Sequence, residues 1–161
     1  MRAMILAAGL GKRMQPLTAN LPKPLLKVRG KPLIEHQIEK LVAAGVSGIV
    51  INHFYLGDMI EAAVGDGKRF GVEISYSRET TRLDTAGGII KSLTQLQDDC
   101  FIVVNADIWT DFDFSSLQAI DGKDRLAGDP IEREHQSGLV DDEKGGHGLS
   151  SPTQVDDEGC R

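Results

Sequence analysis

Residues 6–18, LAAGLGKRMQPLT, place two glycines and two cations directly behind a short apolar run. The run, residues 3–6, is typical of a buried strand, and Ala7 and Ala8 after it are small enough for backbone to lie against a flat ligand. Gly11 can adopt a positive φ and turn backbone N–H groups inward as an anion-binding nest. The stretch therefore predicts a strand that leads into an anion-binding loop.

Two familiar phosphate-binding motifs also combine glycines with a cation, and neither fits this loop. A dinucleotide fingerprint requires a third glycine where this chain has Met14. A Walker loop requires a glycine where this chain has Leu6, and a hydroxyl residue where it has Arg13. The loop alone leaves two interpretations open: an anion site in which Lys12 and Arg13 bind phosphates, or a surface turn with two solvated cations.

The rest of the chain shows alternating strand and helix patterns. Strands are predicted over residues 3–6, 49–51, 72–76 and 101–104, and helices over residues 33–44, 59–64 and 89–96. This order indicates an α/β fold with a mostly parallel, Rossmann-like sheet and helices on both faces. Ligands bind at the carboxyl ends of such strands, so the informative loops are those after Leu6, Asn52, Ser77 and Asn105.

Charge and composition divide the 161 residues into two parts. Residues 1–120 carry 13 acidic and 13 basic side chains, whereas residues 121–161 carry 11 acidic and 5 basic ones and no aromatic. We expect one domain over residues 1–120 and a disordered acidic tail over 121–161, because the tail has too little apolar surface to offset its ordering entropy.

Composition also bears on partners and location. The net charge of -6 argues against a general nucleic-acid binder. No apolar run is long enough to span a membrane, and the first residues do not fit a secretory signal. We therefore expect a cytoplasmic protein with neither nucleic acid nor membrane as a partner. The oligomeric state is left open.

A second cationic element lies at residues 22–25, where Lys23 stands between two prolines. Prolines hold the backbone extended and limit how far the lysine can move. This tetrapeptide is either a phosphate clamp or simply the end of a loop.

Taken together, residues 6–14, 16–18, 22–25 and 105–107 resemble the sugar-1-phosphate nucleotidylyltransferases. The resemblance runs from residue 1 to about residue 114. It implies the nucleotide-diphospho-sugar transferase type of fold. Such enzymes join a nucleoside triphosphate to a sugar 1-phosphate and release pyrophosphate.

Within that family, residues 50–77 and 105–114 are most similar to members that use UTP and N-acetylmuramate 1-phosphate in cell-wall sugar recycling. Two alternatives stay open: guanylyl or thymidylyl transfer to mannose or glucose 1-phosphate, and a non-catalytic nucleotide-binding fragment. The acceptor phosphate is mostly ionised near neutral pH if its second pKa is about 6. The resemblance therefore implies no general base.

The resemblance also assigns roles to individual residues. It implies that Arg13 and Lys23 are catalytic, because they stabilise the triphosphate and the charge on departing pyrophosphate. It implies that Asp107 binds Mg²⁺, and that Asn105 contacts the acceptor sugar phosphate. The implied nucleotide-binding set is Ala8, Gly9, Gly11, Lys12, Arg13, Lys23 and Gly88.

The sequence departs from the family after about residue 121. The family's domain continues there with further strands, an acceptor-sugar pocket and a second metal-binding acid, and residues 121–161 match none of these. We interpret the C-terminal part of the domain as missing or replaced, and expect impaired turnover.

Overall fold

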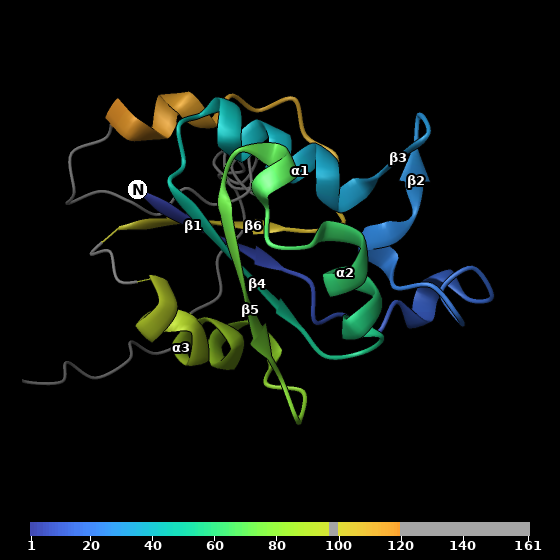
Figure 1. The fold of residues 1–161 in the computed structure, drawn as a ribbon. Helices are drawn as coiled ribbons and strands as arrows, with labels where there is room; N and C mark the ends of the chain where they lie inside the picture. The colour runs from blue at the N-terminus through green and yellow to red at the C-terminus, as the bar shows by residue number, and fades with distance from the viewer. Residues whose placement is uncertain (97–99, 120–161) are drawn as a thin grey trace, which may run out of the picture. The chain divides into compact units, whose positions relative to one another are not determined.

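The computed structural model describes residues 1–96 and 100–119 (Figure 1). The predicted tail, residues 121–161, and its boundary with the domain lie outside the described residues. The strands of the main sheet pair in parallel, in the order β5-β4-β1-β6. These strands are β1 (Arg2–Leu6), β4 (Gly48–His53), β5 (Glu73–Arg78) and β6 (Phe101–Asn105). The predicted α/β class and order of elements are confirmed.

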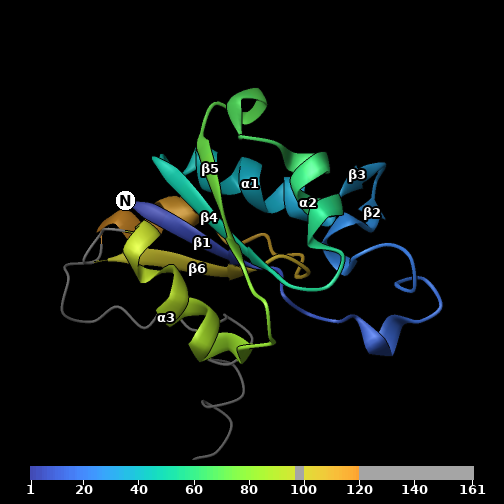
Figure 2. The same cartoon turned by 60° about the horizontal axis from the view of Figure 1, so that its bottom comes forward.

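Three α-helices connect these strands and cover the sheet on both faces. Figure 2 shows α1 (Leu33–Ala43) and α2 (Gly57–Val64) on one face and α3 (Asp84–Leu96) on the other. Among the described residues, no helix is both long and apolar enough to cross a membrane.

Shorter elements complete the described part of the chain. A small antiparallel hairpin pairs β2 (Lys27–Val28) with β3 (Lys31–Pro32) just before α1. The 3₁₀ turns are η1 (Lys12–Met14), η2 (Lys23–Leu25), η3 (Lys68–Phe70) and η4 (Phe114–Ala119).

The alternation of side chains along β1 explains why both faces need a cover. Ala3 and Ile5 are fully buried in the larger core, which also contains buried residues of α1 and α2. Met4 points to the opposite face, where it packs with Val50 and Leu96 in a smaller core beneath α3. Because neighbouring strand residues face opposite sides, a strand buried on both sides reads as a continuous apolar run.

Helix α3 begins at Asp84, five residues before the predicted start at residue 89. Gly87 and Gly88, which precede the predicted start, lie within the helix. The first turn, Asp84-Thr85-Ala86-Gly87, contains no large apolar side chain, so a search for apolar periodicity finds the helix only from Ile89.

The strand order reverses beside β1, and this determines which loops meet. Successive strands β1, β4 and β5 are added in one direction, and β6 then joins the free side of β1. In the pairing register Leu6 lies opposite both Asn52 and Asn105. The loops that follow β1 and β6 therefore leave the sheet side by side, at the kind of switch point where ligands bind in parallel sheets.

At the ends of β4 and β5, a charged cluster fastens α2 to the sheet. Glu61 on α2 lies 2.6 Å from the buried ring Nε2 of His53 and accepts hydrogen bonds of 2.6 and 2.5 Å from Arg78. The hydrogen bonding of Arg78 lowers the pKa of Glu61 below its usual value, and the hydrogen bond with His53 contributes a smaller lowering. The carboxylate is therefore ionised at neutral pH and ties these three elements together.

Truncation of Leu96 tests whether α3 packs on the second face as described. Leu96 is fully buried, whereas Leu93 on the same helix is 46% exposed. Leu96→Ala should lower the free energy of unfolding by about 2–4 kcal/mol through lost burial and the cavity it leaves. Leu93→Ala should cost less than about 1 kcal/mol. Urea unfolding measures both changes, and equal losses for the two variants would contradict this packing.

Candidate functional site

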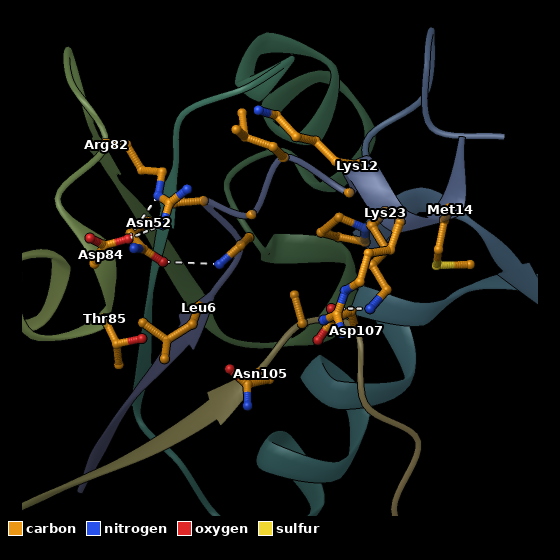
Figure 3. A pocket seen from close by; sticks show the side chains of 18 residues that line it. Leu6, Lys12, Met14, Lys23, Asn52, Arg82, Asp84, Thr85, Asn105 and Asp107 are labelled. Atoms are coloured by element: carbon orange, nitrogen blue, oxygen red, sulfur yellow. Dashed lines mark hydrogen bonds and ion pairs between the residues drawn. The ribbon is translucent and has the colours of Figure 1, made fainter. Parts of the chain in front are cut away.

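A cavity of about 730 Å³ opens at the carboxyl ends of β1, β4 and β6 (Figure 3). One wall is the loop after β1, residues 6–14, together with Lys23. The opposite wall comes from the segment between β5 and α3, and contributes Arg82, Asp84 and Thr85. Asn105 and Asp107 line the floor where β6 ends.

Most residues that the sequence assigned to the site line this one cavity. They are Ala8, Gly9, Gly11, Lys12, Arg13, Lys23, Asn105 and Asp107. Gly88 is the exception, because it lies within α3 and is not among the residues that line the cavity. A Cβ built on Gly88 would stand 2.7 Å from Nδ2 of Asn52 and 2.9 Å from Oε1 of Glu79, so this glycine packs behind the wall.

The loop after β1 is held by a hydrogen bond to its own distal end. Gly11 adopts φ 63°, as predicted, and precedes the 3₁₀ turn η1. The hydroxyl of Thr18, which is 1% exposed, donates a 2.7 Å hydrogen bond to the Gly11 carbonyl oxygen. A Cβ on Gly11 would lie 3.0 Å from Thr18 Cβ, so both φ and packing favour glycine here.

The cations that the sequence assigned to the site come from two separate segments. Lys12 and Arg13 are exposed at the rim, on η1. Lys23 follows Pro22, whose backbone is extended (φ −66°, ψ 142°), and Pro24 behind it is buried. The Lys23 ammonium donates a hydrogen bond to Oδ2 of Asp107, which lies 84 residues later in the chain.

Asp107 is suited to hold a metal only together with a ligand. Within the described part of the chain, no group of three or more His, Cys, Asp or Glu side chains could hold a metal ion. Mg²⁺ is commonly bound by one or two carboxylates and completes its octahedron with substrate phosphates and water. A single carboxylate on the floor of a cavity with a cationic rim fits that arrangement.

The wall opposite the loop after β1, which contains Arg82, Asp84 and Thr85, was not identified from the sequence. Asp84 adopts φ 55°, an uncommon backbone conformation for a residue other than glycine, and accepts a 2.7 Å hydrogen bond from Nε of Arg82. Such conformations often mark ligand-binding segments. The only local signal is the pair of residue types Asp84 and Thr85, which are also typical of ordinary helix capping.

The sequence of the chain matches a known protein family. The family model described as nucleotidyl transferase matches residues 2–130. The chain belongs to the nucleotidyl transferase family. The cavity with its cationic rim is the candidate functional site of this family member.

Two curated proteins show how this nucleotidyl transferase chain relates to characterised members. It is 55% identical, over 72% of its length, to an N-acetylmuramate alpha-1-phosphate uridylyltransferase from Neisseria meningitidis. It is 42% identical, over 74% of its length, to a mannose-1-phosphate guanyltransferase from Gibberella zeae. The chain spans 51% of the first relative and 34% of the second, about half of the length or less.

The fold is also that of solved nucleotidyl transferase structures. A structure described as a putative glucose-1-phosphate thymidylyltransferase from Bacillus anthracis matches with a TM-score of 0.67 and 29% identity. The match covers 73% of this chain and 48% of that one.

Removal of the Thr18 hydroxyl tests how the loop is held. Thr18→Val should free the Gly11 carbonyl and loosen the loop, whereas Thr18→Ser keeps the hydroxyl and serves as the control. A lost hydrogen bond of about 1 kcal/mol corresponds to about fivefold faster trypsin cleavage after Lys12 or Arg13. Mass spectrometry of the fragments measures the rate. Equal cleavage of both variants and the wild type would show that this hydrogen bond does not hold the loop.

Proposed function

We propose that the chain binds UTP with Mg²⁺ and belongs to an enzyme that transfers UMP to a sugar 1-phosphate, N-acetylmuramate 1-phosphate being the favoured acceptor. One observation carries the proposal. Arg13, Lys23 and Asp107, which the family resemblance selects, come from loops far apart in the sequence and line one cavity. The 55% identity to the uridylyltransferase supports the choice of UTP over other nucleotides.

The proposed chemistry is an in-line displacement at the α-phosphorus of the nucleotide. An oxygen of the sugar 1-phosphate attacks, its bond to phosphorus forms, and the bond to the departing pyrophosphate breaks. Catalysis of this kind consists mainly of positioning and charge stabilisation. A bound Mg²⁺ would neutralise phosphate charge and orient the triphosphate oxygens.

The residues of the cavity divide these tasks. The backbone at Ala8, Gly9 and Gly11 would lie against the nucleotide, where small residues permit close approach. Arg13 can bind two phosphate oxygens at once, and Lys12 supplies a point charge at the same rim. Asn105, on the floor, would contact the acceptor.

Lys23 and Asp107 exchange partners in this proposal. In the ligand-free chain they compensate each other's charge through their direct hydrogen bond. When the metal–nucleotide complex enters, Asp107 would turn to the metal and Lys23 to the phosphates, where it stabilises the charge on departing pyrophosphate. The pair thus holds both side chains in place between turnovers.

We assign residues 1–120 to the nucleotidyltransferase domain and expect the protein to act in the cytoplasm, in peptidoglycan recycling. Because Asp107 alone would hold the metal–nucleotide complex loosely, pyrophosphate release from UTP and N-acetylmuramate 1-phosphate should be slower than that of a full-length relative. A rate equal to the relative's would contradict the expected impairment.

Removal of the Arg13 guanidinium tests the binding proposal. Arg13→Ala should weaken UTP binding in the presence of Mg²⁺ by about 10- to 100-fold, because it removes charge-assisted hydrogen bonds to phosphate. Lys68→Ala is the matched control, since Lys68 is 89% exposed and lies outside the cavity. Isothermal titration calorimetry gives both dissociation constants. Equal affinities of the two variants would contradict the assigned role.

Comparison of nucleotides tests the choice of base. UTP should bind more tightly than GTP, dTTP and CTP, each titrated with and without Mg²⁺. Tighter binding of GTP would favour guanylyl transfer, the activity named for the Gibberella relative.

A further inference from the structure

The two walls of the cavity are joined by a buried side-chain bridge centred on Asn52, which itself lines the cavity. Asn52, at the carboxyl end of β4, is only 2% exposed. Its Oδ1 accepts a 3.0 Å hydrogen bond from the backbone N–H of Ala7, the first residue after β1. Its Nδ2 donates a 2.8 Å hydrogen bond to Oε1 of Glu79. One amide therefore connects the loop after β1 with the segment after β5.

Glu79 extends this bridge to the opposite wall. The side chain is buried, with 7% of the residue exposed, and its second oxygen accepts a 3.1 Å hydrogen bond from the backbone N–H of Leu83. Its own backbone N–H donates to the His53 carbonyl oxygen at 2.9 Å. Leu83 lies between Arg82 and Asp84, which line the cavity, so Glu79 fixes the turn that presents them.

Helix α3 packs so closely on this bridge that the position facing it has no room for a side chain. Gly88 lies against the Asn52–Glu79 hydrogen bond, where an added Cβ would stand less than 3.0 Å from both side chains. Contacts this short force something to move, and Asn52 and Glu79 are each held by hydrogen bonds on their other side. Gly88 is therefore packed directly against the bridge.

A buried carboxylate is costly unless its hydrogen bonds compensate. The two donors that the structure places on the Glu79 carboxylate, the Asn52 amide and the Leu83 N–H, are both uncharged. Breaking one member of such a network while leaving the other buried is more destabilising than the net contribution of the bond. Because breaking any of these hydrogen bonds is costly, the bridge restricts the distance between the two walls.

We propose that Asn52 and Glu79 are positioning residues that set the separation of the two cavity walls and, through it, the affinity for nucleotide. This inference rests on the proposed function. Neither residue transfers a proton or carries charge to the phosphates in this role. Their effect is to preorganise the loop after β1 against the turn at Arg82–Asp84, so that the nucleotide does not have to order them on binding.

Exchanging the amide of Asn52 with the carboxylate of Glu79 tests the bridge and leaves the side-chain shapes almost unchanged. In Asn52→Asp the new carboxylate still accepts from Ala7 but faces the Glu79 carboxylate. In Glu79→Gln, whichever way the amide turns, one of the two bonds is lost. In the double variant the carboxylate at position 52 would accept from both Ala7 and the new amide, whose oxygen at position 79 would accept from Leu83. All hydrogen bonds and the net charge are then restored.

Each single substitution should weaken UTP–Mg²⁺ binding by about tenfold, and the double variant should return to within about threefold of the wild type. Ile60→Val, which trims a fully buried side chain of α2 outside the cavity, is the stability control. It should lower the urea midpoint with no change in affinity. Two results would overturn the inference: no recovery in the double variant, or single-variant losses of affinity no larger than that of Ile60→Val.

Trypsin cleavage after Arg82 in the ligand-free protein separates this inference from the proposed function. Each single variant should be cut faster at this bond than the wild type, and the double variant should be cut at the wild-type rate. A wild type that binds no nucleotide would overturn the proposed function. The cleavage rates would still decide the bridge, and equal rates in all four proteins would overturn it.

Discussion

The parallel register of β1 with its two neighbours is the constraint on which the rest of the structure depends. Because Leu6 lies opposite both Asn52 and Asn105, the three strands end at the same level. The loop after β1, the bridge at Asn52 and the acid after β6 are thereby brought to one edge of the sheet. A shift of one residue in either pairing would turn the side chains of that strand to the other face.

Fixed charge is distributed across this edge in a way that suits a polyanion. The rim carries Lys12 and Arg13, while the ammonium of Lys23 is held at the floor by Asp107. A preorganised arrangement of this kind needs little rearrangement when a charged ligand enters, which is the main source of electrostatic stabilisation in enzyme sites. The family relationship and the cavity therefore point in the same direction.

The sequence predicted the parts of this account that depend on local pattern. Apolar runs located the strands, and the composition around Gly11 predicted its positive φ. The early start of α3 at Asp84 was missed, because its first turn has no large apolar side chain. The contacts that assemble the site could not be found in the same way. Lys23 meets Asp107 from 84 residues away, and Asn52 meets Glu79 from 27 residues away, and only the strand order brings such positions together.

Hydrogen–deuterium exchange with and without UTP and Mg²⁺ tests most directly whether the cavity beside β1 is the nucleotide site. The account predicts slower exchange in peptides that cover residues 7–14, 79–86 and 105–107, because these line or brace the cavity. It predicts unchanged exchange in the hairpin of β2 and β3. Protection confined to segments outside the cavity, or no protection at all, would contradict it.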